Sequence, residues 1–133
     1  MSDPVVEAAL DSELEEIAHA IRKNAHAPYS KFKVGAAIRG ASGAVYAGVN
    51  VENASLGLTV CAERNAIAAG IAAGERKFRS IAIATSIGAA PCGACRQVLA
   101  EFAPELPIAL TTKGGETRYF TLGELLPEQF REF

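Results

Sequence analysis

The three cysteines of this 133-residue chain fall into two short segments, Cys61-Ala62-Glu63 and, about thirty residues further on, Pro91-Cys92-Gly93-Ala94-Cys95. Three thiolates can hold one zinc ion. A structural zinc site usually has four protein ligands, whereas a catalytic site has three and leaves the fourth position for water. With Cys61, Cys92 and Cys95 as its ligands, the pattern predicts an open zinc site that does hydrolytic chemistry.

Glu63 lies two residues beyond the first candidate ligand and is the candidate proton carrier of such a site. Zinc can lower the pKa of bound water to about 7, but a poor leaving group still needs a proton donor. A positioned carboxyl group typically contributes ~10²–10⁴-fold as an acid or base. Arg64, next in the chain, can donate hydrogen bonds to the ligand sulfurs and offset the negative charge of three thiolates.

Two other roles for the cysteines stay open on the residues alone. Cys92 and Cys95 form a CxxC pair, which is typical of a redox centre, although the pair does not lie between the first strand of the chain and its helix, as a thioredoxin-like pair would. His19 or His26 could complete a closed structural zinc site, although neither has the paired spacing of such ligands. Both alternatives fit the sequence less well than an open zinc site.

The elements that position these residues alternate between helices and strands. Apolar residues recur at helical spacing from Leu10 to Ile21; Ser12 with Glu15 resembles a capping box, and Asp3-Pro4 is a competing start. Later helices are expected over residues 61–73 and 93–102. Cys61 and Cys92 would then each open a helix, where free N–H groups and the macrodipole favour a thiolate. Strands are expected over residues 33–39, 44–49, 80–85, 108–111 and 117–120.

This alternation indicates a layered α/β sandwich. Residues 40–43, Gly-Ala-Ser-Gly, have the composition of a hairpin turn between the first two strands. Residues 113–116 separate the last two strands, which is far too short for the crossover that a parallel pair requires. The last two strands should therefore be antiparallel neighbours.

Composition and charge narrow the class of protein. Half of the residues are hydrophobic, and the formal net charge is -2 without a basic stripe, so a nucleic-acid polymer is not expected as a ligand. The first residues lack the features of a secretory signal, and no apolar run approaches the ~20 residues of a membrane span. An odd number of cysteines argues against a disulfide framework. The expectation is one catalytic domain, residues 1–133, in the cytoplasm and without a membrane partner.

The segments 61–64, Cys-Ala-Glu-Arg, and 91–97, Pro-Cys-Gly-Ala-Cys-Arg-Gln, together resemble the zinc-dependent cytidine deaminase family in its small, homotetrameric, three-cysteine form. Residues 28–37, 50–55 and 125–127 also resemble that family, so the likeness covers most of the chain. It implies a three-layer α/β/α sandwich around a mixed five-stranded sheet. It also implies one zinc ion per chain and a homotetramer whose active sites are shared between subunits.

The activity implied by the resemblance is hydrolytic deamination of cytidine and 2′-deoxycytidine to the corresponding uridines, with release of ammonia, in pyrimidine salvage. The three cysteines would bind zinc. Glu63 would carry protons from the water to N3 of the base and then to the departing amine.

The resemblance also assigns the substrate contacts. Asn50 and Glu52 would hold the ribose hydroxyls; they are two residues apart at a strand end, so their side chains should point the same way. Phe32 would line the base pocket, and backbone groups near Ala54 would read the base edge. Phe130 would reach into a neighbouring subunit's site. Taken alone, Phe32 fits a core strand residue and Phe130 a hydrophobic C-terminal anchor.

The chain differs from the family pattern at a few positions, and other functions remain open. Leu56 stands where the family often has tyrosine, and Glu128-Gln129 replaces the usual small residues before the terminal aromatic. The nearest alternative function is deamination of a cytosine-containing antibiotic such as blasticidin S. A polynucleotide-editing deaminase and a non-catalytic, zinc-stabilised interaction module are more distant alternatives.

Overall fold

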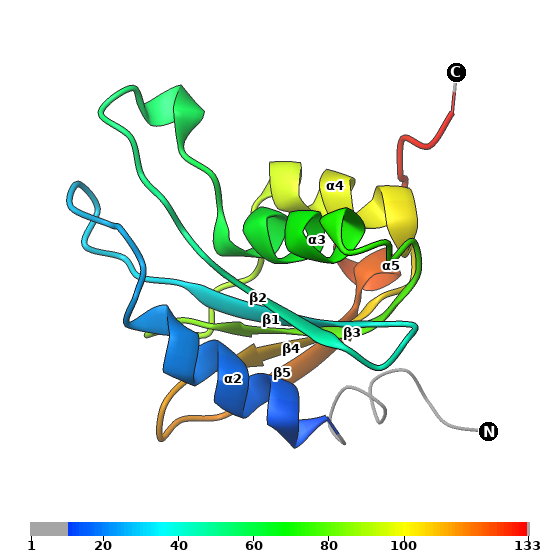
Figure 1. Ribbon diagram of the computed structural model, residues 1–133, viewed down its shortest axis with the longest axis horizontal. Helices are drawn as coiled ribbons and strands as arrows, with labels where there is room; N and C mark the ends of the chain where they lie inside the picture. The colour runs from blue at the N-terminus through cyan, green and yellow to red at the C-terminus, as the bar shows by residue number, and fades with distance from the viewer. Residues whose placement is uncertain (1–10, 133) are drawn as a thin grey trace.

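A computed structural model describes residues 11–132 of the chain as a five-stranded sheet between two layers of helices (Figure 1). Helix α2 covers one face of the sheet, and α3 and α4 lie side by side on the other. The three-layer α/β/α sandwich is therefore confirmed. The helical elements are α2 (Ser12–Arg22), α3 (Ala62–Ala72), α4 (Gly93–Phe102), α5 (Leu122–Leu125) and the short 3₁₀ helix η1 (Leu56–Leu58).

The strand order across the sheet is β2-β1-β3-β4-β5. β1 pairs antiparallel with both β2 and β3, β3 pairs parallel with β4, and β4 pairs antiparallel with β5. The parallel pair is joined through α4, which supplies the long crossover that such a pair requires. The mixed sheet and its antiparallel last pair are as expected. The strands are β1 (Gly35–Gly40), β2 (Val45–Val49), β3 (Phe78–Ala84), β4 (Pro107–Thr111) and β5 (Arg118–Thr121).

The start of α2 differs from the expected capping box at Ser12. Asp11 is the N-cap residue, and its side chain does not cap the helix. Its carboxylate instead accepts hydrogen bonds from Arg39 at 2.9 and 3.0 Å and from Ser80 at 3.0 Å. Tertiary contacts with the sheet have taken the place of a local cap. The competing start at Asp3-Pro4 lies outside the described residues.

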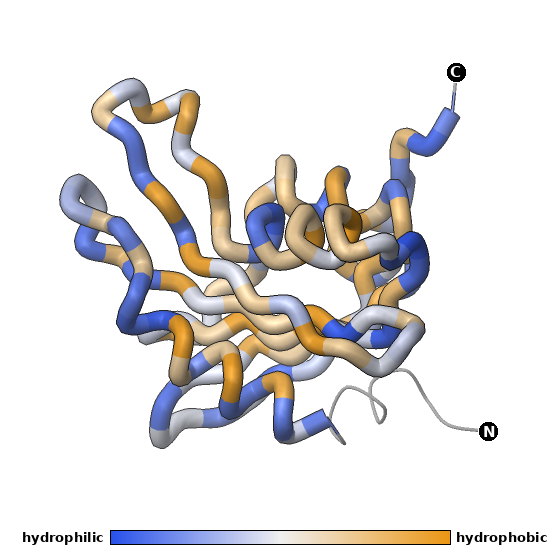
Figure 2. Tube along the Cα trace, in the orientation of Figure 1, coloured by the Kyte–Doolittle hydropathy of each residue, from blue (hydrophilic) through white to orange (hydrophobic). Residues whose placement is uncertain are grey.

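Two apolar clusters fill the spaces on either side of the sheet. On strand β3, Ile81 and Ile83 belong to the cluster under α3 and α4, while Ala82 and Ala84 belong to the cluster under α2. This alternation, with every one of these residues buried, is that of a central strand covered on both faces. Figure 2 shows the same apolar character along the strands.

Helix α3 packs against β2 at the distance that only glycine permits. A Cβ atom on Gly48 would lie 2.5 Å from the backbone N of Ala66 and 2.6 Å from the carbonyl O of Ala62. The close approach brings the first turn of α3 next to the end of β2. The helix start that carries Cys61 and Glu63 is thereby placed beside Asn50.

Candidate metal and catalytic site

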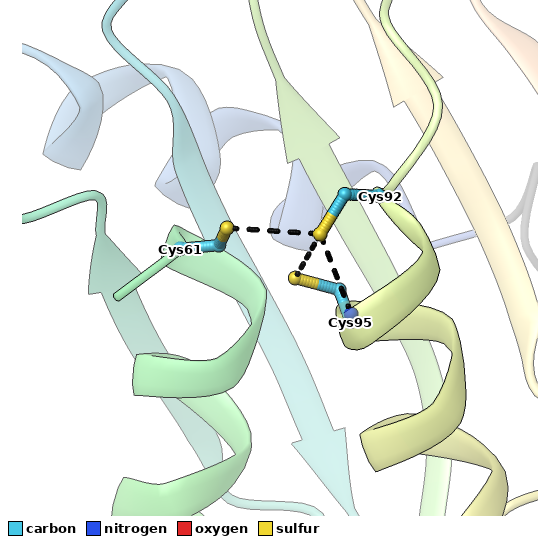
Figure 3. A group of neighbouring side chains, drawn as sticks. All are labelled: Cys61, Cys92 and Cys95. Carbon is cyan, nitrogen blue, oxygen red and sulfur yellow. Dashed lines mark hydrogen bonds between the residues drawn. The ribbon is translucent and has the colours of Figure 1, made fainter. Parts of the chain in front are cut away.

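The three cysteines converge where α3 and α4 begin (Figure 3). Cys61 is the N-cap residue of α3, Cys92 is the N-cap residue of α4, and Cys95 lies in the first turn of α4. The Sγ of Cys92 is 3.8 Å from that of Cys61 and 3.4 Å from that of Cys95, and all three sulfurs lie within 4.8 Å of one another. Tetrahedral zinc with Zn–S bonds of about 2.3 Å separates its sulfurs by about 3.8 Å. The three thiols therefore fit a zinc ion.

The surroundings of Cys61 favour the thiolate that a metal requires, whereas the hydrogen bond with Cys61 and burial raise the pKa of the Cys95 thiol. Hydrogen bonds from Cys95 and Arg64 lower the pKa of the Cys61 thiol to about 5. Arg64 Nη2 lies 3.6 Å from the Cys61 Sγ, while Nε of the same guanidinium is buried without a hydrogen-bond partner among residues 11–132. An uncompensated buried donor is costly, and a negatively charged metal–thiolate group beside it would reduce that cost.

Glu63 is a buried acid beside these sulfurs. Its side chain belongs to the first turn of α3, and only 5% of the residue is exposed. Burial raises the pKa of the Glu63 carboxyl to about 7, and negative charge at Cys61 adds to the shift. An acid with a pKa near neutral can both accept and donate a proton at physiological pH.

A cavity of about 240 Å³ opens in front of the metal cluster, at the end of β3 and next to the starts of α3 and α4. It brings together predicted site residues that lie far apart in the chain: Phe32, Asn50, Glu52, Cys61, Glu63 and Cys92. Most of its exposed lining is apolar, with a few polar groups converging on it. Such a lining is typical of a small-molecule site.

Asn50 and Glu52 both reach across to the segment 29–34. The buried Asn50 donates from Nδ2 to the Phe32 carbonyl at 2.8 Å and accepts at Oδ1 from the Val34 N–H at 2.8 Å. Glu52 Oε1 accepts from the N–H groups of Tyr29 at 2.9 Å and Ser30 at 3.1 Å. The Ser30 hydroxyl donates to Oε2 of the same carboxylate.

These contacts also set the charge state of Glu52. The hydrogen bond from the Ser30 hydroxyl, with those from the two backbone N–H groups, lowers the pKa of the Glu52 carboxyl. The group is therefore a carboxylate at neutral pH and can only accept hydrogen bonds. It would bind a ligand through a hydroxyl or an N–H group of that ligand.

A family model described as "Cytidine and deoxycytidylate deaminase zinc-binding region" matches residues 9–110. The chain belongs to this family. A cytidine deaminase of Halalkalibacterium halodurans is 45% identical over 112 residues, which cover 82% of this chain and 85% of the relative. One from Sporosarcina psychrophila is 43% identical over 112 residues, with 82% of each chain covered. The crystal structure of cytidine deaminase from Burkholderia pseudomallei matches with a TM-score of 0.86 and 48% identity, over 90% of this chain and 98% of that one.

Within this zinc-binding deaminase fold, two predicted site residues lie away from the cavity. Ala54 is exposed in the loop before η1, which projects from the body of the molecule (Figure 1). Phe130 is 63% exposed near the C-terminus, where its carbonyl accepts a hydrogen bond of 2.7 Å from Gln97. Neither lines the cavity beside the cysteine cluster of its own chain. Their expected roles in substrate binding stay predictions, and for Phe130 the prediction concerns a neighbouring subunit.

Several cavity residues were not predicted from the sequence: Ser30, Val34, Thr59, Ile83, Thr85, Ala89 and Ala90. The segment 85–90 could have been anticipated, because it follows a central strand and leads directly to Cys92. Thr85 closes the turn there, since its hydroxyl accepts from the Ala89 N–H at 2.9 Å. Nothing in the sequence predicts that Thr59 lines the cavity, because its position depends on how the projecting loop returns to the body of the molecule.

Proposed function

We propose that this chain is a zinc-dependent hydrolase that deaminates cytidine and 2′-deoxycytidine to uridine and 2′-deoxyuridine with release of ammonia. The observation that carries the proposal is the convergence of Glu63 and the thiol cluster on one small cavity. Membership of the cytidine and deoxycytidylate deaminase family supplies the substrate class. A cytosine-containing antibiotic as substrate is not favoured, since the relatives reported above are cytidine deaminases.

Cys61, Cys92 and Cys95 would hold the zinc, with one ion per chain. When bound, zinc supplies a Lewis acid that lowers the pKa of water to about 7. Glu63 takes a proton from the attacking water as a C–O bond forms at C4 of the base. It delivers that proton to N3, then takes the remaining proton from the new C4 hydroxyl and passes it to the amine, so that a C4 carbonyl forms as the C4–N bond breaks and ammonia leaves. Because the Glu63 pKa is about 7, both directions of transfer are accessible at neutral pH.

Arg64 supports the metal rather than the substrate. Its guanidinium donates toward the Cys61 sulfur and so withdraws part of the negative charge of the thiolates. Hydrogen bonds of this kind orient metal ligands and tune the metal. We assign Arg64 this positioning role.

The sugar and the base would be held by the other side of the cavity. A carboxylate has about four lone-pair sites, and three donors already occupy sites on Glu52, so one acceptor site is left for a ribose hydroxyl. Asn50 keeps a second amide hydrogen and a second lone pair for the same sugar. Phe32 lines the cavity and would face the pyrimidine.

We infer a homotetramer with shared active sites from the apolar side chains near the cavity and the C-terminus. Leu56 and Leu58 are 70% and 67% exposed in the projecting loop, where Figure 2 shows a stretch of hydrophobic colour. A partner subunit would cover this loop, and the partner's Phe130 would complete the base pocket.

The structure has no helix among residues 11–132 that could span a membrane. We place the protein, as one catalytic domain, in the cytoplasm, because its zinc-binding thiols require a reducing compartment.

The test is a spectrophotometric assay of the purified protein with cytidine, together with measurement of bound zinc. We expect the cytidine absorbance to fall and about one zinc to be bound per chain. Zinc-loaded protein without turnover on cytidine or 2′-deoxycytidine would refute the substrate assignment. Glu63→Gln separates an enzyme from a zinc-stabilised interaction module, because only the enzyme loses a measurable activity when zinc content is unchanged.

A further inference from the structure

A second hollow, of about 830 Å³, lies between the C-terminal half of α2 and the loop that joins β4 to β5. Figure 1 shows that loop beside α2, on the face of the sheet opposite α3 and α4. The hollow has no lining residue in common with the catalytic cavity. Its charged lining consists of Arg22, Lys23, Lys33, Lys113 and Glu16. We call it the α2 groove.

The α2 groove is strongly positive in an acidic protein. Four cations face one carboxylate, whereas the whole chain has a formal net charge of -2. Within residues 11–132, ion pairs form only between Arg39 and the carboxylates of Asp11 and Glu13. The groove cations therefore have no carboxylate at salt-bridge distance in the described part of the chain.

Two of the groove cations donate hydrogen bonds to backbone carbonyl groups rather than to carboxylates. Arg22 Nε donates to the Lys33 carbonyl at 2.9 Å, and Lys33 Nζ donates to the Lys23 carbonyl at 3.1 Å. The side chains of Lys23 and Lys113 have no hydrogen-bond partner in the same part of the molecule. Two cations are thus held in place, and two are available to a ligand.

Stabilisation of the α2 macrodipole does not account for so many cations. Basic residues in the last turn of a helix interact with a charge equivalent to about -0.5 at its C-terminus. Arg22 and Lys23 suffice for that, whereas Lys33 and Lys113 come from other segments. The positive charge of the groove also acts on His19, whose Nε2 lies 3.0 Å from the Thr111 hydroxyl. Burial lowers the pKa of His19, Arg22 and Lys113 lower it further, and Glu15 opposes them.

We propose that the α2 groove binds a polyphosphate anion, such as the phosphate chain of a nucleoside triphosphate. Lysine and arginine are the side chains that pair with phosphate oxygens, and a concave arrangement lets several reach one chain of phosphates. Among residues 11–132, no phenylalanine, tyrosine or tryptophan side chain lines the groove. Recognition therefore rests on the phosphates rather than on base stacking, which is the usual means of holding a single-stranded nucleic acid.

The test is isothermal titration of the full chain with inorganic tripolyphosphate and, separately, with a nucleoside triphosphate. We expect saturable binding of both, at one site per chain, which weakens as NaCl is raised from about 50 to about 200 mM. The double variant Lys23→Gln/Lys113→Gln should bind about fivefold more weakly or worse. The matched control Lys77→Gln/Arg79→Gln removes the same charge near the start of β3, at the opposite end of the parallel strand pair, and should change the affinity less than about twofold.

A second measurement locates the ligand without any substitution. Tripolyphosphate in the groove would counteract the field of Arg22 and Lys113, so the NMR-measured pKa of His19 should rise on its addition. Absence of saturable binding, equal losses in the two double variants, or an unchanged His19 pKa at saturation would each refute the proposal. Binding of the nucleotide but not of tripolyphosphate would refute recognition through phosphates, and tighter binding of single-stranded RNA would replace the proposed ligand with a nucleic acid.

Discussion

The side chain of Asn50 holds the backbone of Phe32 in place through two hydrogen bonds to the segment 32–34. Nδ2 donates to the Phe32 carbonyl at 2.8 Å, and Oδ1 accepts from the N–H group of Val34, two residues further along the chain, at 2.8 Å. A residue predicted to bind the sugar thus also fixes the backbone of the residue whose aromatic side chain is predicted to contact the base. The residues expected to contact the sugar and the base are therefore linked by hydrogen bonds.

Asn50→Ala should therefore lower stability as well as substrate affinity. The variant removes two hydrogen bonds of a buried side chain and leaves a backbone N–H and a carbonyl unsatisfied, which costs about 1–3 kcal/mol. Urea unfolding measures this loss, and KM for cytidine should rise more than kcat falls. Asn24→Ala, at an exposed position just after α2, is the control and should leave both quantities unchanged. A stable Asn50→Ala protein with a raised KM would show that the amide serves the substrate alone.

Ser30→Ala tests how the Glu52 carboxylate is oriented. The two backbone donors remain while the hydroxyl donor is lost, so Oε2 is freer to rotate away from the sugar. We expect a severalfold rise in KM with kcat nearly unchanged, and recovery in Ser30→Thr. The control Ser12→Ala, at the exposed start of α2, should behave as the parent does. An equal fall of kcat in Ser30→Ala would instead implicate the hydroxyl in the chemical step.

Glu63→Gln should abolish most of the activity and keep the metal. The amide is nearly isosteric with the carboxyl but cannot carry a proton, so kcat should fall by about 10²–10⁴-fold. Zinc content, measured by atomic absorption, should equal that of the parent. Loss of zinc together with activity would mean that Glu63 holds the metal site together rather than transferring protons.

Arg64→Gln should reduce turnover while the cysteines still bind zinc. Without the guanidinium beside Cys61, the thiolates keep their full negative charge, and the metal becomes a weaker Lewis acid. Loss of a group that supports a metal ligand typically costs about 10–100-fold in activity or metal affinity. Arg79→Gln, which removes an exposed arginine at β3, is the control. Unchanged zinc content and unchanged turnover in Arg64→Gln would contradict the role.

The stability of the chain should depend on pH through Asp11. Hydrogen bonds from Arg39 lower the pKa of the Asp11 carboxyl below its ordinary value of 3.8. A lowered pKa stabilises the fold at pH values above 3.8, and this contribution is lost as the pH falls through the lowered value. Asp11→Asn should therefore destabilise the protein by about 1 kcal/mol at pH 7 and by less at pH 2, because the native carboxyl becomes protonated as the pH falls through its lowered pKa. Thermal melts at both pH values measure the difference, and Glu13→Gln, at a 63% exposed side chain, should cost less at pH 7.

The sequence predicted those parts of the molecule that depend on local chemistry. All five strands appear within two residues of their expected bounds, because their apolar patterns and turn residues are local signals. Helix α5 was missed although its signal was present: Thr121 and Glu124 form a capping box. The capping box at Ser12 was wrong, because Asp11 binds to distant residues of the sheet.

In the site, too, local features could be predicted from the sequence and long-range contacts could not. The metal cluster follows from the spacing of the cysteines and from the two helix starts, which a sequence can reveal. The contacts of Asn50 and Glu52 depend on the segment 29–34 lying alongside residues 50–52. A hydrogen bond of 2.8 Å from the Glu52 N–H to the His26 carbonyl helps to keep the two segments together. No pattern in either segment indicates that pairing.

Along the chain, the two helices that supply the cysteines are connected by a segment that contains β3, and they lie side by side on one face of the sheet. An ion held by both helices would act as a crosslink that closes the intervening segment. Ligands that bind only the native state also suppress its opening. Proteases cleave chains in proportion to the population of opened forms. Zinc supply would therefore govern how long each copy of the protein survives in the cell, in addition to whether it is active.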